Sequence, residues 1–218
     1  MTTVISVLIV TAAYLIGAIP FGFLIGKLNG KDIRREGSCN IGATNVTRVV
    51  GKSWGKLCFL CDFLKGFLPV FLVMRFHPED GWLIALTALA AMLGHIFPVY
   101  LGFKGGKGVS TAAGAALALC PAAVLGAGVV WAAVFFLFRY VSLASLAAAV
   151  TLPAMAWILK LFAGAALPLP VGILLIVFAL LTFWRHRSNI VRLMNGTESR
   201  FVKNKKEDRN TTEIEERK

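Results

Sequence analysis

Long apolar segments alternate along the chain with short basic and polar stretches. The five clearest apolar segments cover residues 4–25, 57–76, 82–103, 141–161 and 167–184. At a helical rise of about 1.5 Å per residue, about 20 apolar residues cross the roughly 30 Å hydrocarbon core of a bilayer. The pattern therefore predicts an all-α integral membrane protein in which these segments are spanning helices.

A sixth apolar segment, residues 109–138, is ambiguous. It is too long for one untilted span and short for two. Cys120 and Pro121 lie at its middle, and a proline is accepted in the first turn of a helix. The pair can therefore end one short helix and begin the next.

The placement of basic residues decides between six and seven crossings. Seven lie within residues 27–56 and ten within residues 185–218, and the positive-inside rule puts both groups on the cytoplasmic side. They share a side only if residues 109–138 cross twice. The sequence therefore predicts seven transmembrane helices, with the N-terminus outside and the C-terminus cytoplasmic. With this topology, 20 of the 23 basic residues lie on the inner side.

Composition supports the membrane prediction and sets the domain count. The 218 residues are 57% hydrophobic and only 16% charged, whereas an ordinary soluble domain is about a quarter charged. A net charge of +12 would favour nucleic acid on a soluble face. Here long apolar segments separate the charges, so no nucleic-acid partner is expected. Residues 1–200 are predicted to form one membrane domain, and the polar tail 201–218 is predicted to be disordered.

Several polar side chains inside the apolar segments have simple structural interpretations. Asp62 and Lys65 are three residues apart, so they are predicted to form an ion pair or an interhelix polar network. His95 is as suited to bond a neighbouring helix as to bind a ligand. The cysteines are interpreted as buried thiols and no metal site is expected, because no further Cys or His stands at zinc-site spacing; they are Cys39, Cys58, Cys61 and Cys120.

The first of three candidate anion sites is the run GSCNIGATNVTR at 37–48. Its small residues let backbone N–H groups approach an anion, and Arg48 can hold phosphate oxygens with two hydrogen bonds. A turn-rich loop with helix caps at Ser38 or Asn45 explains the same run equally well.

The second candidate is GHIFP at 94–98 followed by KGGKGVST at 104–111. Two lysines in a glycine loop at the start of a helix favour an anion, because the free N–H groups and the helix dipole act in the same direction. A plain positive-inside loop needs the lysines but not the glycines. The run does not match a nucleotide-binding P-loop.

The third candidate is RHRSNIVRLMNGTE at 185–198, where the last apolar segment ends. On a continued helix, His186 and Asn189 share a face, and Arg192 extends it by one more step. Arginines at the membrane interface are the simpler interpretation, but that does not explain His186 and Asn189. All three candidates fall on the predicted cytoplasmic side.

The three runs, in this order, resemble the bacterial acyl-phosphate:glycerol-3-phosphate acyltransferases. The pattern of that family is approximately GSGNPGATN..R, GH.FP...GFKGGKGV.T and RHR.NI.RL..GTE, and the resemblance covers essentially the whole chain. Two positions depart from it, because Cys39 and Ile41 stand where the family usually has Gly and Pro. A Cβ at position 39 is unfavourable if that residue needs a positive φ.

The resemblance implies transfer of a fatty acyl group from acyl phosphate to the 1-hydroxyl of sn-glycerol 3-phosphate. The products are 1-acylglycerol 3-phosphate (lysophosphatidic acid) and phosphate, in phospholipid biosynthesis. It also implies a multi-pass protein of the bacterial cytoplasmic (inner) membrane that contacts membrane lipid and needs no cofactor. Functional coupling to an enzyme that produces acyl phosphate is compatible with this activity.

The resemblance also implies site residues, position by position. The residues expected to contact glycerol 3-phosphate are Ser38, Arg48, Lys107, Ser142, His186 and Asn189. Of these, the catalytic residues are expected to be Lys107, His186 and Asn189. The acyl phosphate is expected at Asn40, Gly42, Thr44, Asn45, Lys104, Gly105, Gly106 and Gly108. Either His186 or a phosphate oxygen of the substrate takes the proton of the attacking hydroxyl.

Two other classes of protein remain as alternatives from the residues alone. A transporter of a phosphorylated solute usually binds its substrate near the membrane midplane, whereas the polar runs here lie at one surface. A scaffold that binds anionic lipids needs basic residues but leaves the glycines, His186 and Asn189 unexplained.

Overall fold

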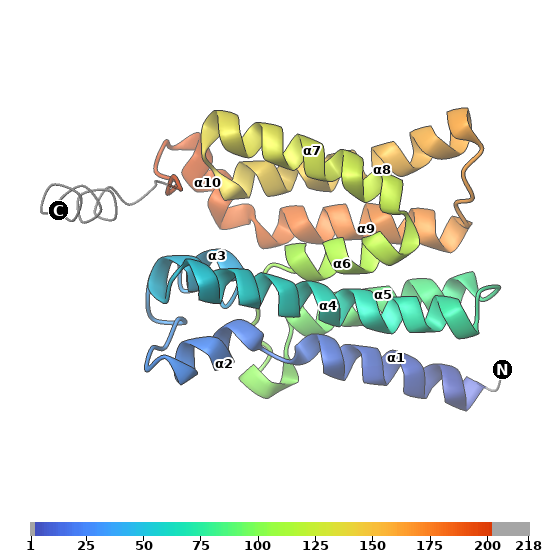
Figure 1. The fold of residues 1–218 in the computed structure, drawn as a ribbon, viewed down its shortest axis with the longest axis horizontal. Coiled ribbons are helices and arrows are strands. Elements are labelled where there is room, and N and C mark those ends of the chain that lie inside the picture. Colours follow the sequence, from blue (N-terminus) through green and yellow to red (C-terminus); the bar gives the residue numbers. More distant parts are fainter. Residues whose placement is uncertain (1–2, 202–218) are drawn as a thin grey trace, which may run out of the picture.

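A computed structural model describes residues 3–201, which form a helical bundle without a β-strand (Figure 1). The helices are α1 (Thr3–Ala18), α2 (Phe21–Leu28), α3 (Ala43–Val49), α4 (Lys52–Phe76), α5 (Gly81–Ile96), the 3-10 turn η1 (Val99–Leu101), α6 (Val109–Leu119), α7 (Pro121–Phe138), α8 (Val141–Ala163), α9 (Leu169–Arg185) and α10 (Arg187–Met194). The all-α prediction is confirmed for this part of the chain. The tail predicted to be disordered lies outside it, except for Phe201, whose ring packs on that of Phe135 at 5.8 Å.

Within residues 3–201, five stretches are long and apolar enough to cross a membrane: Thr3–Leu28, Lys52–Phe76, Gly81–Leu101, Pro121–Phe138 and Val141–Ala163. A sixth consists of α9 and α10, which meet at a bend of 58°. The ambiguous segment does divide at Cys120, as the proline suggests. However, α6 has 11 residues, about 16 Å of helix, and is too short to cross alone. Seven full crossings therefore stay a prediction.

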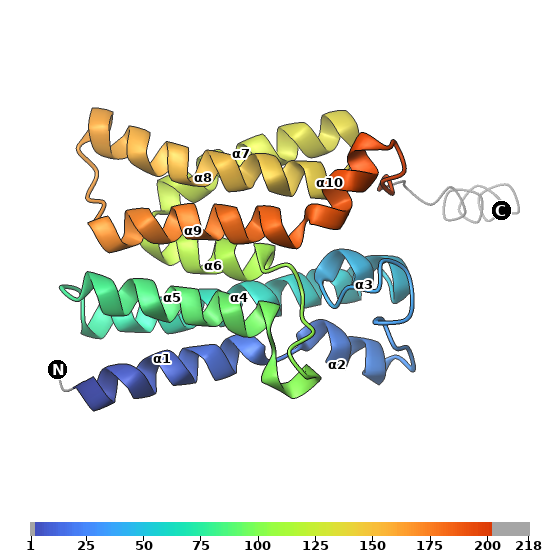
Figure 2. The ribbon, with the colours of Figure 1, turned by 180° about the vertical axis from the view of Figure 1, so that it is seen from behind.

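The helices form two groups with α6 between them (Figures 1 and 2). One group contains α1 to α5 and the other contains α7 to α10. Helices α2, α3 and α10 lie at the same end, so the first and third polar runs meet there although they are far apart in sequence. After α5 the chain passes beside α1 and returns to begin α6 near the middle of the bundle (Figure 2).

Glycines without a side chain let two pairs of helices approach closely. A Cβ on Gly17 of α1 would lie 2.1 Å from the carbonyl oxygen of Ala91 in α5, and one on Gly94 of α5 would lie 2.2 Å from the backbone of α1. Gly66 and Gly114 join α4 to α6 in the same reciprocal way, at 2.1 and 2.0 Å. In lipid there is little hydrophobic driving force between helices. Small residues at such crossings let the backbones approach, so that van der Waals packing holds the helices together.

The first apolar segment is not one continuous helix, because α1 ends at Ala18 and α2 begins at Phe21. At the break the carbonyl of Ile19 accepts two hydrogen bonds, one from the backbone N–H of Phe21 at 3.1 Å and one from Nζ of Lys65 at 2.8 Å. Lys65 is also 2.7 Å from Oδ1 of Asp62, and both side chains are only 2% exposed. The predicted ion pair is therefore confirmed, and its lysine also hydrogen-bonds a backbone carbonyl at the break between α1 and α2.

Candidate active site

A cavity of about 590 Å³ opens between the two groups of helices and joins all three polar runs. It is lined by all six residues expected to contact glycerol 3-phosphate: Ser38, Arg48, Lys107, Ser142, His186 and Asn189. Five of the positions expected to bind acyl phosphate also line it: Asn40, Gly42, Thr44, Asn45 and Gly108. Lys104, Gly105 and Gly106 are not among its lining residues.

The first polar run is shaped by the buried amide of Asn45. Its Oδ1 accepts a hydrogen bond from the backbone N–H of Ser38 at 2.8 Å. Its Nδ2 donates to the carbonyls of Ile33 at 2.8 Å and Glu36 at 3.1 Å. All three hydrogen bonds of the amide therefore go to the loop backbone. Asn45 contributes to the cavity by fixing the shape of this loop.

The two departures from the family pattern have different consequences. Cys39 lies in the left-handed region at φ 56°, which costs an L-residue roughly 1–2 kcal/mol relative to glycine. It is exposed, so the expectation of a buried thiol is wrong at this position, although it holds for Cys58. Ile41 is 4% exposed and packs in an apolar cluster with Ile33 and Val46.

The glycine loop of the second run has its backbone groups occupied. The N–H groups of Gly105 and Gly106 each donate at 3.1 Å to the carbonyls of Ile96 and His95, respectively. The carbonyls of both glycines accept from Arg185. Because these backbone groups already have protein partners, they are not free to bind a phosphate. Lys104, just before the two glycines, is exposed.

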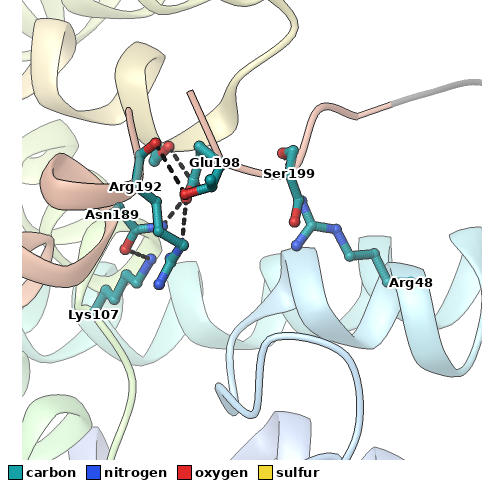
Figure 3. Close-up of polar contacts among 8 residues, drawn as sticks. Arg48, Lys107, Asn189, Arg192, Glu198 and Ser199 are labelled. Carbon is teal, nitrogen blue, oxygen red and sulfur yellow. Dashed lines mark hydrogen bonds and ion pairs between the residues drawn. The ribbon is translucent and has the colours of Figure 1, made fainter. Parts of the chain in front are cut away.

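Lys107 lines the cavity and enters a chain of hydrogen bonds (Figure 3). Its Nζ donates to Oδ1 of Asn189 at 2.6 Å. Nδ2 of Asn189 and Oγ of Ser142 both donate to Oε1 of Glu198 at 2.7 Å. Nε of Arg192 donates to Oε2 at 2.7 Å. Glu198 is not among the residues expected at the site, and its only signal in the sequence is its place at the end of the third run.

The charges of this chain are shifted by their surroundings. Burial lowers the pKa of Lys107 to about 8, and the neighbouring arginines act in the same direction. Burial alone would raise the pKa of the Glu198 carboxyl, but hydrogen bonds from Ser142, Asn189 and Arg192 hold it below its usual value. The site therefore holds a carboxylate and an ammonium group linked through the amide of Asn189.

His186 lies at the bend between α9 and α10, so His186 and Asn189 do not lie on one straight helix. The bend still leaves both buried and facing the cavity, with 2% and 5% of their surfaces exposed. Nδ1 of His186 is 2.8 Å from the carbonyl oxygen of Thr182. A carbonyl can only accept, so Nδ1 carries the proton and Nε2 of the neutral ring is left with a lone pair.

Arg48 approaches the cavity from α3 on the other group of helices (Figure 3). Its Nη2 donates to the carbonyl oxygen of Ser199 at 3.3 Å, which ties α3 to the segment after α10. Within residues 3–201 no cluster of three or more His, Cys, Asp or Glu side chains is arranged to hold a metal ion.

A second cavity, of about 420 Å³, adjoins the first and is almost entirely apolar. Alanine, leucine and phenylalanine side chains from α4, α6, α7, α8 and α9 form most of its wall. Four residues line both cavities: Phe59, Val109, Trp131 and Ser145. The indole Nε1 of Trp131 donates to Oγ of Ser145 at 3.3 Å at this junction.

Known proteins show the same sequence pattern over nearly the whole chain. The profile of a family described as glycerol-3-phosphate acyltransferase matches residues 7–196. The chain belongs to this family. A glycerol-3-phosphate acyltransferase of Aquifex aeolicus is 46% identical over 196 residues, which are 90% of this chain and 99% of the relative. One of Desulfotalea psychrophila is 49% identical over 195 residues, 88% of this chain and 95% of the relative.

Solved structures of the glycerol-3-phosphate acyltransferase family have the same fold. A crystal structure of PlsY (YgiH), described as an integral membrane glycerol 3-phosphate acyltransferase, is similar in its glycerol 3-phosphate form with a TM-score of 0.85. It is 45% identical and the match covers 90% of this chain and 96% of that one. Its lysophosphatidic acid form gives a TM-score of 0.83. The present protein is accordingly a multi-span integral membrane acyltransferase of phospholipid biosynthesis.

Proposed function

We propose that the protein transfers a fatty acyl group from acyl phosphate to the 1-hydroxyl of sn-glycerol 3-phosphate, with release of 1-acylglycerol 3-phosphate and phosphate. The observation that carries the proposal is the pair of adjoining cavities. One is polar and contains Arg48 and Lys107, and the other is apolar. A donor with an anionic group and a fatty chain fits across their shared wall.

The acceptor is assigned to the polar cavity. Arg48 and Lys107 supply positive charge for the phosphate of glycerol 3-phosphate, and Ser38, Ser142 and Asn189 supply hydrogen-bonding groups beside it. The first polar run, around Asn40 and Gly42 to Asn45, is assigned to the phosphate of the donor. This assignment leaves out Lys104 to Gly106, because none of the three lines the polar cavity.

The reaction needs no covalent enzyme intermediate, because acyl phosphate is already an activated mixed anhydride. The 1-hydroxyl oxygen attacks the acyl carbon and forms the ester bond, while the bond from that carbon to the phosphate oxygen breaks and its electron pair leaves with phosphate. The protein brings two anions together and stabilises the developing charge. The hydroxyl proton passes to Nε2 of His186 or to a phosphate oxygen of the substrate.

The proposed topology is seven crossings of the bacterial inner membrane with the polar cavity on the cytoplasmic side. An odd number of crossings is supported by the described chain, because the start of α1 and the end of α10 lie at opposite ends of the bundle (Figure 1). A C-terminal fluorescent-protein fusion that fluoresces and a C-terminal alkaline phosphatase fusion that is inactive would support the cytoplasmic assignment. The reverse pair of results would contradict it.

The purified protein in a lipid mesophase tests the activity. We expect phosphate release and lysophosphatidic acid formation from glycerol 3-phosphate with palmitoyl phosphate, and neither product with palmitoyl-CoA or palmitoyl-acyl carrier protein. Lys107→Ala should lose turnover, whereas Lys56→Ala, an exposed lysine at the same end of the molecule, should retain it. Folded protein that is inactive with all three donors would contradict the proposal and direct attention to solute transport.

A further inference from the structure

The glycine loop before Lys107 is held from two sides. On one side, the N–H groups of Gly105 and Gly106 donate to the end of α5. On the other, the half-buried Arg185 at the end of α9 donates from Nη2 to the carbonyl of Gly105 at 3.0 Å and from Nε to the carbonyl of Gly106 at 3.1 Å. One planar guanidinium therefore fixes two consecutive peptide groups.

Space beneath the loop is equally restricted. A Cβ on Gly106 would lie 2.0 Å from Nε2 of His95, so the backbone rests directly on that ring. The ring in turn lies beside Asp62, with Nδ1 of His95 3.5 Å from Oδ1. The loop is thus enclosed by buried groups of α4 and α5 below and by Arg185 above.

Lys107 is the next residue along, and its side chain bridges from this loop to Asn189. Arg185 itself is absent from the lining of the polar cavity. Without the guanidinium, the two glycines would leave the segment before Lys107 with unusual backbone freedom. The ammonium group would then no longer be held opposite the phosphate site.

We propose that Arg185 is a positioning residue that holds the Lys107 ammonium in the anion site through the carbonyls of Gly105 and Gly106. The inference rests on the proposed function, because it takes the phosphate of glycerol 3-phosphate as the group that Lys107 binds. The geometry of the guanidinium matters more than its charge. A lysine at position 185 keeps the charge but lacks the rigid fork that reaches two carbonyls.

Arg187 provides a matched control. It has the same side chain two residues later, and both guanidinium groups lie over the ring of Trp184, at 5.4 Å for Arg185 and 5.3 Å for Arg187. Arg187 is exposed, and its Nη1 donates to the carbonyl of Trp184 at 3.4 Å, outside the loop. Substitution of either arginine therefore changes the net charge equally while only one disturbs Gly105 and Gly106.

The first measurement is binding of glycerol 3-phosphate to the purified full chain by calorimetry, together with KM for glycerol 3-phosphate under turnover. We expect Arg185→Lys and Arg185→Gln each to weaken binding by about 10-fold, the effect of about 1.4 kcal/mol. Arg187→Lys and Arg187→Gln should stay within about 2-fold of wild type. Wild-type affinity in Arg185→Lys, or equal losses at both arginines, would overturn the proposal.

A double-mutant cycle separates positioning of Lys107 from an independent effect. If Arg185 acts through Lys107, adding Arg185→Lys to Lys107→Ala should weaken binding of glycerol 3-phosphate, measured by calorimetry, by less than about 2-fold further. A second full loss of about 10-fold would show independent action and contradict the inference. Melting temperatures of all variants accompany the kinetics, and Arg185→Lys with the cycle decides the question if Arg185→Gln does not fold.

The pH dependence of kcat/KM distinguishes loss of positioning from general destabilisation, because destabilisation would not shift it. Release of the loop exposes Lys107 to water, so its pKa should rise from about 8 towards its ordinary value. The alkaline limb of kcat/KM should therefore shift to higher pH in Arg185→Lys and stay in place in Arg187→Lys. The charged and titratable groups that face Lys107 are Glu198, Arg192, Arg48, Arg185 and His186, and Arg185→Lys leaves all their charges unchanged.

The proposed function and this inference fail in different ways. Wild-type protein that does not turn over acyl phosphate, but binds glycerol 3-phosphate with the expected difference between Arg185 and Arg187, contradicts the donor assignment alone. Active wild-type protein with no difference between the two arginines contradicts the positioning role alone.

Discussion

Nζ of Lys107 lies 2.6 Å from Oδ1 of Asn189, a contact that spans 82 residues of sequence. The opposite end of the same amide donates to Glu198. The amide therefore separates the ammonium from the carboxylate and prevents a direct ion pair. Lys107 keeps a positive charge that an incoming phosphate can use.

Asn189→Asp should reverse this arrangement. The new carboxylate would pair with Lys107 and repel Glu198, so it would compete with the substrate phosphate for the ammonium group. We expect KM for glycerol 3-phosphate to rise about 10-fold or more, the effect of losing a charge-assisted contact. Asn195→Asp, at an exposed position after α10, is the control and should leave KM within about 2-fold. Equal KM values in the two variants would contradict the separating role of Asn189.

Activity should fall at alkaline pH because of Lys107. Its pKa is lowered to about 8 by burial, and phosphate binding requires the protonated form. kcat/KM for glycerol 3-phosphate should be level below pH 8 and should fall about 10-fold per unit above it. The phosphate of bound substrate stabilises the ammonium form of Lys107, so the alkaline fall of kcat should lie at higher pH than the fall of kcat/KM. Lys107→Arg keeps its charge throughout; an unchanged alkaline limb in that variant would assign the titration to another group.

Cys39→Gly should stabilise the fold, because Cys39 is an exposed L-residue at φ 56°. Relief of this conformation is worth about 1 kcal/mol after the greater freedom of glycine in the unfolded chain is counted. The melting temperature in detergent should rise by about 2–4 °C. Cys39→Ala keeps the Cβ and should not reproduce the gain. A similar rise in both variants would point to loss of the thiol as the cause.

Gly128→Leu should shift the chain-length preference of the enzyme. Gly128 lines the apolar cavity, and a Cβ added there meets nothing within 4 Å, so a leucine side chain can extend into the space assigned to the acyl chain. kcat/KM should fall for long acyl phosphates and hold for short ones. Val129→Leu, at an exposed neighbouring position, should leave the preference unchanged. A uniform loss over all chain lengths would contradict the assignment of this cavity.

The apolar pattern predicted the spanning segments well because each must bury about 20 residues in lipid whatever its partners are. It missed the interruption between α1 and α2. That break is stabilised by Lys65, distant in sequence, whose Nζ donates a second hydrogen bond to the carbonyl of Ile19. The pattern predicted the division at Cys120, but not that α6 is too short to cross alone, since an apolar run indicates that a segment is buried but does not distinguish burial in lipid from burial against α4 and α5.

The sequence by itself determined the family, because its short polar runs are recognisable wherever the chain carries them, and the resemblance predicted six residues for glycerol 3-phosphate that all line the polar cavity. Only the tertiary structure decided how the backbone of each run is used. It left Lys104 to Gly106 outside the lining of the cavity and placed the carboxylate of Glu198 against Ser142, Asn189 and Arg192, which line it. The physical reason is that a buried peptide group or carboxylate must find a hydrogen-bond partner, and those partners come from other helices.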